Sequence, residues 1–173
     1  MNHWYMLTLV GKDRPGIVAH VTAALYEGGC NLGEASMLRL GDSFTIMMMV
    51  KSAGNTKALH DLVLPVAQSM GLHLHVDRID GHLHRHIDPD VQITVYSADR
   101  PGIVAHVTGA LAQAGLNIVN LDTDVGGDDA SPIFIMHIDG VAGEGIEALQ
   151  SALDIVKKEG IEASITPLET MIG

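Results

Sequence analysis

Hydrophobic and polar positions alternate in several short stretches of the chain, and this period of two is typical of β-strands. The first stretch, residues 4–10, is followed by Gly11 and predicts a strand. Helical spacing of apolar residues follows at positions 17, 21, 24 and 25, and Gly28-Gly29 should end this helix. We expect Pro15 to lie in its first turn and the Asp13 side chain to accept from the free N–H groups there.

The pattern then predicts a hairpin, a second helix and a last strand. Strands 31–40 and 44–50 flank the turn residues Gly41-Asp42. The second helix, residues 56–70, contains Pro65, which should kink it or end its first half. Its expected inner stripe is Leu59, Leu62, Val63, Val66 and Met70. After Gly71, alternating Leu72, Leu74 and Val76 predict the last strand, and the element order is βαββαβ.

Ten residues of the first half, DRPGIVAHVT at 13–22, recur unchanged at 99–108. Such identity predicts a tandem of one module, with a first domain at 1–86 and a second at 87–173. Residues 81–90 form the predicted linker. In the second copy we expect strands 91–96, 117–125, 133–138 and 161–166, helices 101–114 and 144–159, and a longer hairpin loop at 126–131.

Two βαββαβ modules predict an α+β protein of ferredoxin-like domains, each a four-stranded antiparallel sheet with two helices on one face. Both faces of the strand 44–50 are apolar, because Phe44, Ile46 and Met48 alternate with Met47 and Met49. Ile133 and Phe134 begin a similar pattern in the second copy. We therefore expect the open sheet faces to be covered by the sister module or by another chain.

The net charge of −11 is uneven along the chain. Residues 1–88 contain seven Lys and Arg against eight Asp and Glu, whereas residues 89–173 contain three against thirteen. Direct binding of nucleic acid requires a basic face, so it is not expected. The longest apolar stretch, 46–50, is too short to span a membrane, the N-terminus lacks a signal-peptide pattern, and Cys30 is the single cysteine. These features predict a cytoplasmic protein.

The repeated loop and the asparagines downstream of it resemble those of ACT domains, small regulatory modules that bind amino acids. Asp-Arg-Pro-Gly-Ile follows the first strand of each copy, and Asn31 and Asn117 each lie fifteen residues beyond its glycine. In ACT domains the ligand lies where the first loop of one module meets strand two of its neighbour. The resemblance therefore implies ligand-binding residues Asp13, Arg14, Pro15, Gly16, Ile17 and Asn31, with Asp99, Arg100, Pro101, Gly102, Ile103 and Asn117 in the second copy.

The chemistry of these residues suits an amino acid. A glycine lets backbone approach a ligand closely, and the N–H groups of a helix start favour a carboxylate. Asp13 and Asp99 can accept from an ammonium group. The alternative to a ligand site is ordinary helix capping by Asp and Pro. In that interpretation Arg14 and Arg100 are solvent or interface charges. Ile17 and Ile103 are then core residues.

The ligand is not identified by the sequence. The serine-sensing ACT domain of phosphoglycerate dehydrogenase has a histidine two residues before the acidic or amide position, where this chain has Gly11 and Ser97. A tandem pair with no catalytic domain is most similar to the glycine cleavage system transcriptional repressor family. That resemblance implies a glycine sensor that restrains a DNA-binding activator by protein contact, without cofactor or enzyme activity. A homodimer is expected.

Two other interpretations remain. The same folds could serve as a ligand-free scaffold for association. His73, His75, His82, His84 and His86 lie within fourteen residues and could bind zinc, nickel or copper, although a polar edge strand and linker explains them as well.

Overall fold

The computed structural model describes residues 2–79, 87–128 and 131–168, and it divides into two compact units, Met1–Arg85 and His86–Gly173. We call them unit 1 and unit 2 and describe each by itself. Most of the predicted linker lies outside the described residues, as do His82, His84 and His86.

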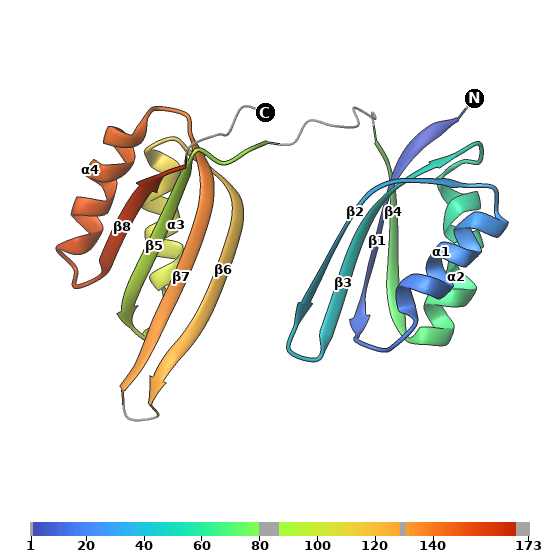
Figure 1. Ribbon diagram of the computed structural model, residues 1–173, viewed down its shortest axis with the longest axis horizontal. Helices are drawn as coiled ribbons and strands as arrows, with labels where there is room; N and C mark the ends of the chain where they lie inside the picture. The colour runs from blue at the N-terminus through green and yellow to red at the C-terminus, as the bar shows by residue number, and fades with distance from the viewer. Residues whose placement is uncertain (1, 80–86, 129–130, 169–173) are drawn as a thin grey trace. The chain divides into compact units, whose positions relative to one another are not determined.

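Unit 1 has the predicted βαββαβ order. Its elements are β1 His3–Lys12, α1 Ile17–Glu27, β2 Asn31–Leu40, β3 Ser43–Ser52, α2 Thr56–Met70 and β4 Leu72–Ile79. The four strands are antiparallel in the order β2-β3-β1-β4, and both helices cover one face of the sheet (Figure 1). The ferredoxin-like prediction is therefore confirmed for this unit.

Unit 2 repeats the arrangement. Its elements are β5 Val91–Ala98, α3 Ile103–Gln113, β6 Leu116–Asp128, β7 Ser131–Ala142, α4 Ile146–Lys157 and β8 Glu162–Pro167. The strand order is β6-β7-β5-β8, again antiparallel (Figure 1). The two units thus share one topology, as the repeat predicts.

The core of each unit lies between the sheet and its helices, because every second strand residue points toward them. In unit 1, Tyr5, Leu7 and Leu9 of β1 are buried beneath the α1 stripe. That stripe consists of Ile17, Val21 and Leu25. Val91, Ile93 and Val95 lie beneath Ile103, Val107 and Leu111 in unit 2. The predicted periodicities are confirmed in both units.

Helix α2 spans Thr56–Met70 as predicted, and Pro65 lies inside it without ending it. The prediction for the second hairpin loop is wrong. The predicted loop 126–131 is largely strand, because β6 extends through Asp128 and Gly127 pairs with Pro132 of β7. The left-handed φ of +87° at Gly127 and the close Ser131 carbonyl, 2.6 Å from a Cβ built there, explain why glycine occupies this position.

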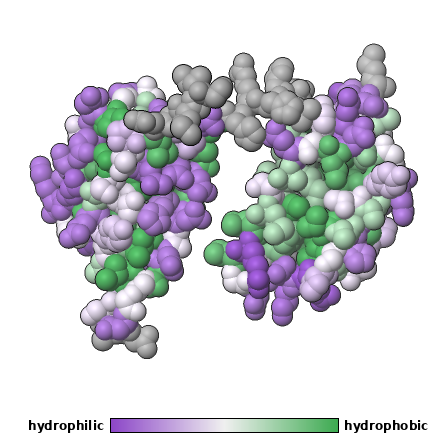
Figure 2. Space-filling model, in the orientation of Figure 1, coloured by the Kyte–Doolittle hydropathy of each residue, from purple (hydrophilic) through white to green (hydrophobic). Residues whose placement is uncertain are grey.

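The open sheet faces of the two units differ in polarity. In unit 1 this face presents Met47 of β3, 48% exposed, together with Val10 of β1 and Leu38 of β2, which pair with Thr45 two residues before it. In unit 2 the corresponding face is polar and acidic over most of its area, with Asn120, Asp122, Asp124, Thr94, His137 and Asp139. On the side shown in Figure 2, hydrophobic residues gather over unit 1, whereas the same view of unit 2 is more hydrophilic. The predicted apolar pattern in unit 2 is confined to Ile133 and Ile135.

Candidate functional site

The repeated loop adopts the same backbone in both units. Gly16 and Gly102 precede helices α1 and α3 with φ angles of +88° and +92°, in the left-handed region. A residue with a Cβ is strained there, which accounts for glycine at both positions. The first helical hydrogen bonds run from the His20 and His106 N–H groups to the Gly16 and Gly102 carbonyls, 2.9 Å in each case.

The predicted capping of these helices is wrong. The helices begin two residues after Pro15 and Pro101, and no side chain caps either N-terminus. Neither first turn contains an acidic residue. Asp13 is held elsewhere, because its N–H donates to the Asp42 carbonyl across 2.8 Å, beyond the end of β1. The N–H groups of each first turn, which lack partners within the helix, are therefore not capped by a side chain.

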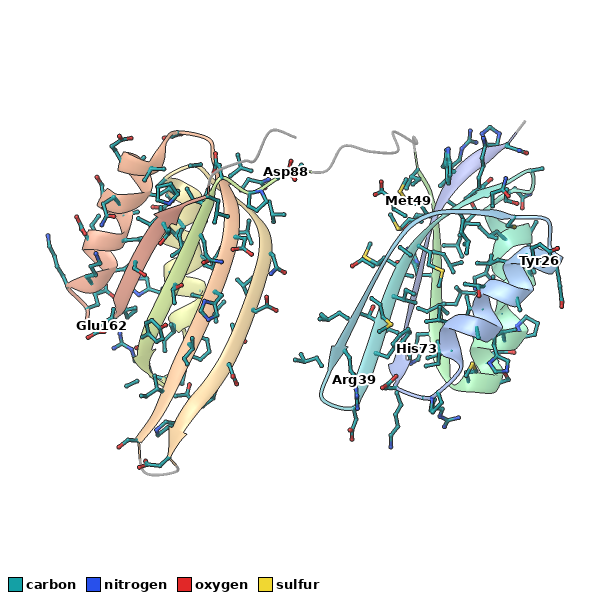
Figure 3. The ribbon with its side chains drawn as sticks, in the orientation of Figure 1. Tyr26, Arg39, Met49, His73, Asp88 and Glu162 are labelled. Atoms are coloured by element: carbon teal, nitrogen blue, oxygen red, sulfur yellow. The ribbon has the colours of Figure 1, made fainter. Side chains whose placement is uncertain are left out.

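The two loop carboxylates have different surroundings. Asp13 Oδ2 lies 3.0 Å from Nε of Arg39, at the hairpin end of β2 (Figure 3). Strand register places Val125 at the position of Arg39 in unit 2. Among the described residues, no cation is paired with Asp99. An arginine beside the carboxylate is thus a feature of unit 1.

The two repeated histidines also have different partners. His20 Nδ1 lies 2.6 Å from the Gly16 carbonyl oxygen, within its own loop. His106 Nδ1 lies 2.9 Å from Glu159 Oε2, just beyond the end of α4. Arg100 also donates to the main-chain carbonyl of Glu159, across 3.0 Å. The second loop is therefore tied to the end of α4, and the first is not.

A cavity adjoins each loop, but on different sides. The cavity of unit 1, about 340 Å³, lies between the loop and the β2–β3 hairpin, where Met37 and Phe44 line it. The cavity of unit 2, about 520 Å³, lies between the loop and the α4–β8 connection, where Glu159 and Ile161 line it. Identical loop sequences thus border two chemically distinct cavities.

The predicted asparagines lie far from the loop of their own unit. Asn31 pairs with Lys51, which pairs with Trp4 near the start of β1, whereas the loop follows Lys12 at its end. Eight residues of strand correspond to about 25 Å. Asn117 likewise pairs with Val141, near the start of β5. Within one unit the structure does not bring the asparagine and the loop together.

The remaining predicted loop residues divide into buried and exposed. Ile17 and Ile103 are 2% and 4% exposed, which confirms their interpretation as core residues. Arg14, Pro15, Arg100 and Pro101 are exposed. Sequence reasoning missed Arg39 and Glu159, which come within reach of the loops only through the hairpin and the last helix.

No group of three or more His, Cys, Asp or Glu side chains in residues 2–79, 87–128 and 131–168 is placed to hold a metal ion. No helix in that part of the chain is long and apolar enough to cross a membrane.

Comparison with known families identifies the modules. Models of the ACT domain match residues 3–77 and residues 91–154. The chain belongs to the ACT-domain family and consists of two ACT domains in tandem.

Individual relatives are similar to parts of the chain. The chain is 28% identical to the glycine cleavage system transcriptional repressor of Escherichia coli over 69% of its own length, and it spans 63% of that relative. It is 35% identical to a UPF0237 protein of Lactococcus lactis, over 41% of this chain and 83% of the relative.

Solved structures show the same fold over nearly the whole chain. A protein of unknown function from Galdieria sulphuraria superposes with a TM-score of 0.80 at 23% identity, covering 98% of this chain and all of that one. A structure provisionally assigned as a glycine cleavage system transcriptional repressor gives a TM-score of 0.72 at 22% identity, with 98% and 99% covered.

Proposed function

We propose that this tandem ACT protein binds a small amino acid at its two repeated loops and transmits occupancy through contact with another protein. The observation that carries the proposal is the pair of uncapped helix starts at Gly16 and Gly102. Main-chain N–H groups at such a position bind carboxylates. Because neither Asp13 nor Asp99 occupies them, the capping alternative loses its basis.

The rest of an amino-acid site needs acceptors for an ammonium group. Asp13 and Asp99 supply carboxylates beside the loops, and the Asn31 and Asn117 amides supply further polar groups. Since each asparagine lies at the far end of its own sheet, a site that used both elements would draw them from neighbouring modules, in one chain or in a homodimer.

The 28% identity to the Escherichia coli repressor suggests the regulatory setting. By that likeness the ligand is glycine, and the protein partner is a DNA-binding activator held in check as part of transcriptional repression. Residues 89–173 contain three positive side chains and thirteen negative ones. This negative balance favours contact with a protein over contact with DNA.

A thermal-shift measurement against the twenty amino acids tests the proposal. A ligand that binds only the folded chain stabilises it, by about 2.7 kcal/mol at a free ligand concentration of one hundred times Kd. This stabilisation raises Tm. The variant Asp13→Asn with Asp99→Asn should lose most of the shift. Glu27→Gln with Glu162→Gln removes one exposed carboxylate from each unit, neither of them in the repeated segment, and should keep the shift.

Two results would count against this function. If no amino acid raises Tm at millimolar concentration, the protein is better described as a ligand-free association scaffold. If the Asp13 and Asp99 double variant responds like the wild type, the loop carboxylates do not hold the ligand.

A further inference from the structure

The cavity beside the second loop is bounded by charges of both signs. Arg100 and His106 belong to the loop and to α3, whereas Glu159 comes from the segment after α4. The cavity measures about 520 Å³, within the range of small-molecule sites. All of these groups belong to unit 2, so the cavity needs no neighbouring module to supply its charges.

Glu159 retains capacity for a ligand. Its contact with His106 uses Oε2, at 2.9 Å, and its side chain is 40% exposed. A carboxylate offers about four acceptor positions, so one imidazole leaves room for an ammonium group. The Arg100 bond goes to the main-chain carbonyl of Glu159 rather than to its carboxylate.

The positive side of the cavity is formed by the start of α3. Its first-turn N–H groups have no side-chain cap, and Gly102 keeps the approach open, since a Cβ built there meets no atom within 4 Å. Arg100 lines the same cavity and adds a guanidinium group. Positive and negative groups therefore border one space, as a zwitterion requires.

Unit 1 lacks this arrangement despite its identical loop. The residue directly before the glycine that follows the second helix is Met70 in unit 1 and Glu159 in unit 2. Met70 packs on the core as a partly buried hydrophobic residue. With no carboxylate there, His20 bonds to the Gly16 carbonyl instead. A single residue outside the repeat thus changes the chemistry of the loop.

We propose that unit 2 contains a self-contained site for a small α-amino acid on the α4–β8 side of its loop. The ligand carboxylate lies at the start of α3 beside Arg100, and its ammonium group lies at Glu159. Pro101 and Ala105 line the space left for a short side chain. This inference rests on the proposed function and adds a site that is specific to the second unit.

Calorimetry on the full chain tests the site with glycine and L-alanine as probes. Glu159→Met gives unit 2 the residue of unit 1, and Glu159→Gln removes the charge while keeping the shape. Both variants should weaken binding at one set of sites at least tenfold, in line with loss of a charge-assisted hydrogen bond. Glu162→Gln, three residues further on in β8 and outside the cavity lining, should bind like the wild type.

Acetate and methylammonium, each with one of the two charges, should bind at least tenfold more weakly than glycine. The melting temperatures of both Glu159 variants report whether unit 2 remains folded. If they bind glycine and L-alanine like the wild type, the site in unit 2 is refuted while amino-acid sensing stands. If the wild-type chain binds no amino acid, the proposed function fails and this inference fails with it.

Discussion

Nδ1 of His20 donates to the carbonyl oxygen of Gly16 across 2.6 Å, and the bond holds the imidazole against the turn that begins α1. A Cβ built on Gly16 would lie 3.0 Å from two atoms of this ring. In unit 2 the equivalent histidine turns to Glu159, and Gly102 has open space around it. The same glycine therefore tolerates substitution differently in the two copies.

We expect Gly102→Ala to destabilise its unit by about 1–2 kcal/mol, the cost of a left-handed residue with a Cβ. Gly16→Ala should cost more, because the His20 ring must also move. Urea denaturation of each variant measures the difference. In a Gly16→Ala background, His20→Ala should bring the cost down to that of Gly102→Ala; equal costs in the single variants would contradict this account.

The pKa of Asp61 should respond to Lys57. A hydrogen bond from Lys57, one turn earlier on α2, holds the pKa of the Asp61 carboxyl below its ordinary value. Stability from a lowered carboxyl pKa is present above the unfolded-state value and is lost as pH falls through the folded-state value. Lys57→Ala should therefore raise the Asp61 pKa toward normal in an NMR titration. Lys12→Ala, on β1, should leave it unchanged.

The apolar open face of unit 1 predicts association. We expect the wild-type chain to form a homodimer, and Met47→Asp, which places a charge in the middle of that face, to shift the mass toward the 18.4 kDa of one chain. Light scattering after gel filtration measures the mass. Thr94→Asp, on the open face of unit 2, is the matched control and should not dissociate it. A Met47→Asp chain with wild-type mass would show that this face is not the interface.

The element order follows from local patterns, which is why the sequence predicts it well. Alternation in residues 4–10 and 72–76 and the glycines after each helix depend on neighbouring residues only. The prediction of a loop at 126–131 is wrong because Gly-Gly-Asp-Asp is typical of turns, whereas pairing between Gly127 and Pro132 continues the β-ladder. Long-range pairing here overrides local preference.

The loop residues could be found from the repeat, but their partners could not. Asp-x-Pro at a helix start is typical of capping, and nothing local indicates that Gly16 adopts the left-handed region and ends the capping role of Asp13. Arg39 and Glu159 reach the loops through the hairpin and the second helix of their units. Their effect depends on tertiary structure, so the ten identical residues have different surroundings in the two units.

The contrast between the two open sheet faces means that ionic conditions act on each unit through a different force. Sulfate strengthens the burial of apolar surface, so it should favour contacts of the Met47 face. Simple salt instead screens repulsion among the aspartates that border His137 in unit 2. At physiological ionic strength the Debye length of the solution is about 8 Å. Association through the open face of unit 1 therefore depends on the hydration of apolar surface, whereas association through the open face of unit 2 depends on counterions.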